Sequence, residues 1–243
     1  MLGDGSLLSD AYRLVSEFQT LIAGVIALVA AYLTVRTMRQ QIRQSDDHAA
    51  DIRRRKSKAA RAAMPGALSA LCDHAEASAY VAVRLRRAVD GNEIGRRASE
   101  ETHSISALVI PQGAITILRE CIEFSDDEPA ESISELIRTL QIQYARLRGI
   151  AADCRGENSG SSIVVTTLLN ADQNIFDATN LYALTESLFV YARAETDSAP
   201  SRVCQDDVLR ALFILRIHEQ DFPSVYEMIA RRFERDNGAG SDE

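Results

Sequence analysis

The sequence FQTLIAGVIALVAAYLTV, residues 18–35, decides how the N-terminal part of this chain folds. It holds 18 residues without a charged side chain, and nine of them are Leu, Ile, Val or Phe. At 1.5 Å per residue, a helix of this length spans about 27 Å, close to the hydrocarbon thickness of a bilayer. The nine large apolar residues favour insertion by about 3–5 kcal/mol. The stretch therefore predicts one transmembrane helix.

The charges that flank the span predict its orientation. Arg36, Arg39 and Arg43 follow it at once, and residues 36–61 hold nine Lys or Arg against three Asp. Residues 1–17 hold three acidic side chains and one Arg. Because basic flanks stay on the cytoplasmic side, we expect residues 1–17 outside the cytoplasm and the chain after Arg36 inside it.

A cleaved signal peptide and a buried core helix are the two alternatives for this stretch. Signal peptides carry basic residues before the apolar run and small residues at a cleavage site. Here the basic residues come afterwards, and Val35 leads directly into Arg36. A buried core helix has no need of such a charge asymmetry, so the transmembrane interpretation is favoured.

The remaining sequence predicts an all-α protein in which the span continues into a juxtamembrane helix and a cytosolic helical bundle. Helical periodicity and turn residues divide the chain into a short N-terminus (1–17), the span (18–35), a basic juxtamembrane helix (36–64), a first helical half (65–154), a linker (155–162), a second helical half (163–235) and a disordered tail (236–243).

Particular helices follow from their apolar spacing. Pro65 and Gly66 predict a kink or a helix start. Residues 163–167 have strand propensity taken alone, but the apolar spacing beyond them favours one helix of about 30 residues. The apolar segment 208–217 is expected to be the most buried helix. One shared core is predicted for six residues, namely Leu136, Leu140, Leu168, Ile175, Tyr182 and Leu212.

Two patterns predict weak homodimerisation. Small residues line one flank of the span, at Ala23, Gly24, Ala27 and Ala31, and close approach along small residues drives helix association in lipid. Beyond the span, alternating intervals of three and four give a coiled-coil seam of about two and a half heptads, formed by Val35, Met38, Ile42, Ser45, Ala49 and Ile52. A lone solvated helix is the alternative for this second segment.

Charge separates the two parts of the chain. Residues 1–61 have ten basic and six acidic side chains, a net charge of +4, and the whole chain has −8, so residues 62–243 have −12. Nucleic-acid binding is excluded for so acidic a domain because it needs a basic face. The basic cluster is expected either to be solvated or to contact anionic lipid, through Arg53, Arg54, Arg55, Lys56 and Lys58.

No residue pattern predicts catalysis, a metal site or a cofactor. The four cysteines lie 33 to 50 residues apart, so they are expected to be free thiols, mostly buried. Arg193 and Arg210 lie in apolar helices and are expected to be buried and paired with Glu186, Glu195 or Asp207. The chain is therefore not expected to be an enzyme.

The segment QTLIAGVIALVAAYLTVRTMRQQI, residues 19–42, resembles a group of alphaproteobacterial proteins that begin with a QTL-x-AG…AL-x-AA…TVR segment and continue into helices. The resemblance covers about a tenth of the chain. It implies a bacterial inner-membrane protein with a helical cytosolic part and assigns no activity.

These observations predict a membrane-anchored interaction or scaffolding protein whose partners are the lipid bilayer, a second copy of the chain and an unidentified protein. The alternative is a single-pass sensor that holds a small ligand between its helical halves, around residues 155–162 and Arg193.

Overall fold

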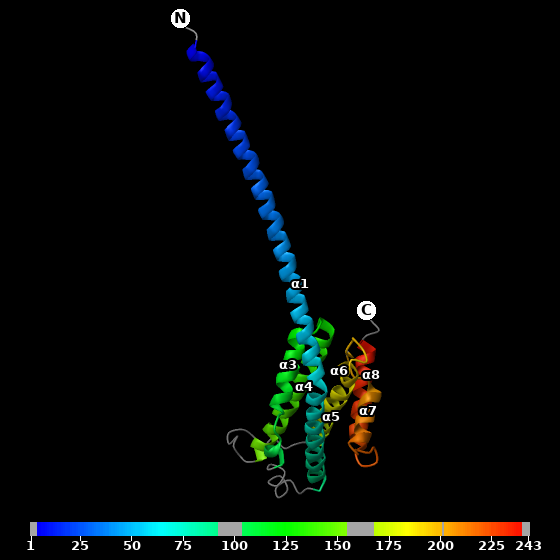
Figure 1. Ribbon diagram of the computed structural model, residues 1–243. Helices are drawn as coiled ribbons and strands as arrows, with labels where there is room; N and C mark the ends of the chain where they lie inside the picture. Colours follow the sequence, from blue (N-terminus) through cyan, green and yellow to red (C-terminus); the bar gives the residue numbers. More distant parts are fainter. Residues whose placement is uncertain (1–3, 92–103, 155–167, 201, 240–243) are drawn as a thin grey trace. The chain divides into compact units, whose positions relative to one another are not determined.

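A computed structural model of the protein describes residues 4–91, 104–154, 168–200 and 202–239 (Figure 1). These residues are helical throughout, with turns between helices, and contain no strand, which confirms the all-α prediction. The helices are α1 (Asp4–Asp90), α3 (Gln112–Phe124), α4 (Asp127–Cys154), α5 (Leu168–Ser187), α6 (Phe189–Ala192), α7 (Gln205–Ile214) and α8 (Pro223–Ala239). The predicted linker and residues 163–167 lie outside the described residues.

The chain divides into two compact units, Met1–Arg55 and Lys56–Glu243. In the first unit, residues 4–55 are helical, and every described side chain from residue 18 to residue 55 is exposed. The second unit is a helical bundle with three buried hydrophobic clusters. Helix α1 is continuous from one unit into the other, so the predicted unbroken passage from the span into the next segment is confirmed.

Pro65 lies inside α1 and does not begin a helix. A proline in a helix interior removes one backbone hydrogen bond and costs roughly 3 kcal/mol. Its neighbours Met64 and Leu68 are fully buried in the bundle, and burying two such side chains contributes about 3–6 kcal/mol. Tertiary packing thus outweighs the local cost of the proline.

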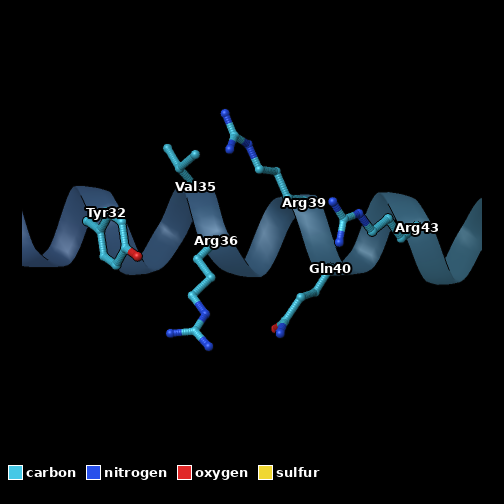
Figure 2. Close-up of a pocket in the computed structure, with 6 residues that line it drawn as sticks. All are labelled: Tyr32, Val35, Arg36, Arg39, Gln40 and Arg43. Carbon is cyan, nitrogen blue, oxygen red and sulfur yellow. The ribbon is translucent and has the colours of Figure 1, made fainter.

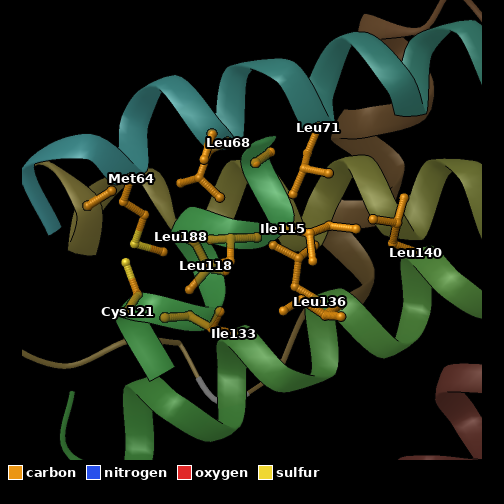
Figure 3. Close-up of a cluster of buried hydrophobic side chains, with 14 of the residues drawn as sticks. Met64, Leu68, Leu71, Ile115, Leu118, Cys121, Ile133, Leu136, Leu140 and Leu188 are labelled. Atoms are coloured by element: carbon orange, nitrogen blue, oxygen red, sulfur yellow. The ribbon is translucent and has the colours of Figure 1, made fainter. Parts of the chain in front are cut away.

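The first hydrophobic cluster joins side chains of α1, α3, α4, α5 and α6 (Figure 3). Helices α1, α3 and α4 contribute side chains at helical spacing, so that their apolar faces meet around Leu188 at the end of α5. The labelled members are Met64, Leu68 and Leu71 from α1, Ile115, Leu118 and Cys121 from α3, and Ile133, Leu136 and Leu140 from α4.

The second cluster lies between α5, α7 and α8, with Ala79 and Ala82 of α1, and contains Ile175 and Leu212. The prediction of one core is therefore wrong, because Leu136 and Leu140 belong to the first cluster. Tyr182 packs against both clusters, and the side chain of Leu168 lies outside the described residues. The division arises because α5 contacts α4 as well as α7 and α8, so its different faces enter different clusters (Figure 1).

Helix α7 is not the most buried helix. Val208, Ala211 and Leu212 are buried, whereas Phe213 and Ile214 are 72% and 42% exposed. The helix carries its own apolar side chains on more than one face, but the bundle covers only one of these faces. The central position belongs to α5, in which buried residues occur on every turn from Ala171 onward.

The neighbours Leu212 and Phe213 give a matched test of this packing. Leu212→Ala is expected to lower the free energy of unfolding by about 2–5 kcal/mol, since it removes a fully buried side chain. Phe213→Ala is expected to change it by less than about 0.5 kcal/mol, because the ring is exposed. Denaturant titration followed by circular dichroism measures both, and equal losses would contradict the placement of α7.

Candidate functional site

Within the described residues, α1 is the one helix long and apolar enough to cross a membrane, with a mean hydropathy of 1.9 in its most apolar window. None of that window is buried in the fold. Within residues 4–55, every described side chain of residues 18–35 is exposed, which disfavours the alternative of a buried core helix.

The turn that follows the span carries a collar of cations (Figure 2). Arg36, Arg39 and Arg43 extend outward from the helix, with Tyr32 one turn before Arg36. All are exposed, and the arginines make no ion pair with described residues. Tyrosine is enriched where a membrane meets water, and unpaired arginines next to a span set its orientation. The predicted role of these arginines in setting the orientation of the chain remains a prediction.

The small-residue flank of the span is open. Ala23, Gly24, Ala27 and Ala31 are exposed, and a methyl group added at Gly24 would meet nothing within 4 Å. The predicted self-association through these residues remains a prediction.

The basic cluster has mixed surroundings. Arg55 pairs with Asp51 at 2.9 Å, and the Lys56 ammonium lies 4.9 Å from the centre of the Phe124 ring. Arg53 lies about 26 Å along the helix axis from Arg36, beyond the ~8–10 Å over which surface charges act at physiological salt. Lipid contact by these residues, which remains a prediction, therefore requires the helix to approach the membrane surface lengthwise.

Arg61 on α1 contacts both α6 and the segment that follows it. Its guanidinium lies 4.2 Å from the centre of the Tyr191 ring, its Nε donates to the Tyr191 carbonyl at 2.7 Å, and its Nη2 donates to the Thr196 carbonyl. A longer contact reaches Asp197 at 3.4 Å. The sequence placed Arg61 in a run of surface cations, and nothing in its local pattern distinguishes it from them.

The two arginines singled out in the sequence have different environments. Arg210 is half-exposed and pairs with Asp207 at 3.1 Å and with Glu186 at 3.6 Å, so its predicted partners are confirmed. Neither arginine is buried as predicted: Arg193 is exposed, and its guanidinium lies 5.2 Å from the centre of the Phe189 ring. The ligand site predicted around Arg193 and residues 155–162 falls on the linker, which lies outside the described residues.

A buried polar cluster between α1 and α4 was not foreseen. The Nδ1 of His74 donates to the Val109 carbonyl at 3.2 Å, which leaves its Nε2 as an acceptor. That Nε2, the Ser78 hydroxyl and both amide atoms of Gln143 are buried without a hydrogen-bond partner. Burial lowers the pKa of His74, outweighing the opposing effects of the Val109 carbonyl and the Gln143 side chain.

This histidine predicts a pH effect on stability. Because its pKa is lowered by folding, the unfolded state binds the proton more readily, so stability is complete above the unfolded pKa of ~6.5 and is lost as the pH falls below it. The melting temperature is expected to fall less steeply with acidification in His74→Gln than in the wild type. Thermal denaturation across this pH range measures the two slopes, and identical slopes would contradict the assignment to His74.

A groove of about 350 Å³ lies between α4, α5, α8 and residues 202–203. The Arg232 guanidinium lies 4.6 Å from the centre of the Phe176 ring, and Arg138 pairs with Glu135 at 2.7 Å. Arg202 also lines the groove, as does Glu131, so three cations and two carboxylates gather there. These residues come from separate helices without a shared motif, and only the packing of the bundle brings them together.

The described thiols and acids do not form a metal centre. No group of three or more His, Cys, Asp or Glu side chains in the described ranges could hold a metal ion. Cys72, Cys121 and Cys204 are free thiols, and burial raises the pKa of Cys72 and of Cys121 to about 11. Those two thiols are therefore protonated and unreactive at neutral pH.

The chain matches no protein-family model, and comparisons with curated proteins and with solved structures found no significant match.

Proposed function

We propose that this protein is a single-pass protein of a bacterial inner membrane that presents a helical bundle to a protein partner in the cytoplasm. One observation carries the proposal: an exposed apolar segment with an arginine collar belongs to the same unbroken helix as the bundle's first buried residues. In this arrangement the chain anchors and displays a binding domain. We place its role in binding rather than in catalysis.

The anchor is tested by charging the centre of the span. Each arginine at a helix centre opposes insertion by about 2.5–3.5 kcal/mol, so Ile26→Arg with Val29→Arg outweighs the 3–5 kcal/mol that favours insertion. The double variant is expected to leave the membrane fraction on alkaline carbonate extraction, whereas Ile26→Leu with Val29→Leu stays in it. Circular dichroism checks that the bundle of the released variant is folded. A wild type extracted as readily as the arginine variant would refute the anchor.

The partner is tested on the full chain in native membranes. Affinity capture through a C-terminal tag, with mass spectrometry, is expected to recover the same protein from wild type and from the Phe213→Ala variant. The Leu212→Ala variant, captured at a temperature at which circular dichroism shows its bundle unfolded and the wild type folded, is the matched control and should lose that protein. Equal recovery from folded and unfolded bundles would argue against recognition by the bundle.

The groove between α4, α5 and α8 favours a second function, the binding of a small anionic ligand by a membrane-anchored sensor. The volume of the groove lies within the range of small-molecule sites, and Arg202 and Arg232 place positive charge in a groove that the Phe176 ring also lines. A ligand that binds only the folded state raises the melting temperature. A thermal-shift screen of anionic metabolites should therefore give hits that are lost in Arg202→Ala, and a screen without such hits would remove this alternative.

A further inference from the structure

The stalk, residues 36–55, separates its polar and apolar side chains onto different faces. All of its large apolar residues, Met38, Ile42 and Ile52, fall on the predicted seam. Every stalk position away from the seam is polar or charged except Ala50. Such a distribution is typical of a helix that packs along one narrow stripe.

No part of the described chain covers this stripe. Met38 is 58% exposed, Ile42 is 60% exposed and Ile52 is 43% exposed, and no described side chain from residue 18 to residue 55 is buried. Most helical stability in proteins comes from the packing of an apolar face. The exposed stripe is therefore available to a partner from outside the chain.

The same seam continues into the span without a change of phase. Going backward from Val35 in steps of four and three gives Ala31, Leu28, Gly24 and Leu21. Large residues occupy the a positions of this segment, and small residues occupy its d positions. Heptad packing produces a left-handed crossing, which most transmembrane bundles share with soluble coiled coils. One superhelix can thus run across the membrane boundary.

We propose that residues 21–52 form a parallel, two-stranded coiled coil with a second copy of this chain. The inference rests on the proposed membrane anchor, which holds two copies in the same orientation and at the same depth, so that identical seams face each other in register. An unrelated partner would need the same heptad phase in both lipid and water. A second copy has the same heptad phase in both regions because its sequence is identical.

The charges of the stalk agree with this register. Arg36, Arg43, Asp47, Asp51 and Arg54 occupy positions away from the seam, where they remain in water. Where the two helices flank each other, the parallel register brings Gln41 of one copy beside Asp46 of the second. His48 of one copy lies beside Arg53 of the second, so this pair does not join two Lys or Arg side chains. No pair of like charges opposes association.

Disulfide crosslinking along the stalk tests the proposal on the full chain in membranes. The parent carries Cys154→Ala and Cys204→Ser, and keeps Cys72 and Cys121 because their raised pKa makes them unreactive. Single cysteines are then placed on the seam (Met38→Cys, Ile42→Cys, Ser45→Cys) and off it (Gln40→Cys, Gln44→Cys, Asp47→Cys). Mild oxidation should give severalfold more dimer at the three seam positions, and the parent should give none.

A second substitution separates packing from chance collision. In the Ser45→Cys chain, Ile42→Asp should abolish the dimer, and Gln44→Asp, off the seam, should leave it intact. Equal dimer at all six positions, or none at the seam in a chain shown by flotation to be in the membrane, would overturn the coiled coil and leave the anchor standing. A chain that does not float with the membrane would overturn the anchor itself.

Discussion

Replacement of Arg86 with alanine is expected to lower the free energy of unfolding of the helical bundle by about 3–5 kcal/mol. Arg86 on α1 donates through Nε to the Asp172 carboxylate on α5 at 2.7 Å, and it also pairs with Asp90. Its side chain is 12% exposed and that of Asp172 is 6% exposed. The substitution leaves the buried carboxylate without its cation, and the effect is expected to be large for that reason.

An ion pair between α4 and α5 supplies the matched control for the Arg86–Asp172 pair. Arg146 on α4 pairs with Asp177, but the Arg146 side chain is 49% exposed, and Asp177 keeps a hydrogen bond from Gln173 at 2.6 Å. Arg146→Ala is therefore expected to cost only about 1 kcal/mol.

Denaturant titration of both variants, followed by circular dichroism, measures the difference. Adding Asp172→Asn to Arg86→Ala should restore part of the stability, because the amide removes the buried charge. If Arg86→Ala and Arg146→Ala lower the free energy of unfolding by similar amounts, burial of the Arg86–Asp172 pair does not determine how much that pair stabilises the bundle.

Reversing the charge of the arginine collar is expected to disturb the orientation of the chain. With Arg36, Arg39 and Arg43 changed to Glu, the residues that follow the span lose their closest basic charges and no longer differ in sign from residues 1–17. Since Lys and Arg near the ends of a span determine which side stays inside, a mixed population of both orientations is expected.

Protease protection of sealed vesicles measures the two populations. The triple change to Lys keeps the charge and should keep a single orientation. A single orientation in the Glu variant as well would show that the bundle, rather than the collar, prevents translocation.

The sequence is sufficient for features that depend on local pattern. The all-α architecture and the long apolar helix at the N-terminus follow from apolar spacing and from hydropathy. The sequence alone is enough to single out the collar arginines, because their predicted effect on orientation depends only on their position directly after the apolar segment. The same reasoning finds the seam of the stalk, because its large apolar residues recur at heptad spacing.

Other features depend on contacts between distant residues and were not predictable. Pro65 continues a helix because Met64 and Leu68 are buried by α3 and α4. Helix α5 is central although Asp172 and Asp177 give it a polar sequence, since arginines from α1 and α4 neutralise both carboxylates. Helix α7 has the opposite character, with an apolar sequence and an exposed side. Periodicity reports which face of a helix is apolar, but it does not report how many neighbours cover the helix.

If one helix anchors this chain with its bundle in the cytoplasm, the C-terminal end lies in the cytoplasm as well. Two fusions placed after Glu243 in a bacterial host locate that end: a phosphatase that is active only in the periplasm, and a fluorescent protein that matures only in the cytoplasm. Membrane-associated fluorescence and no phosphatase activity are expected. An active phosphatase would contradict this topology, because the arginine collar and the bundle would then lie in the periplasm.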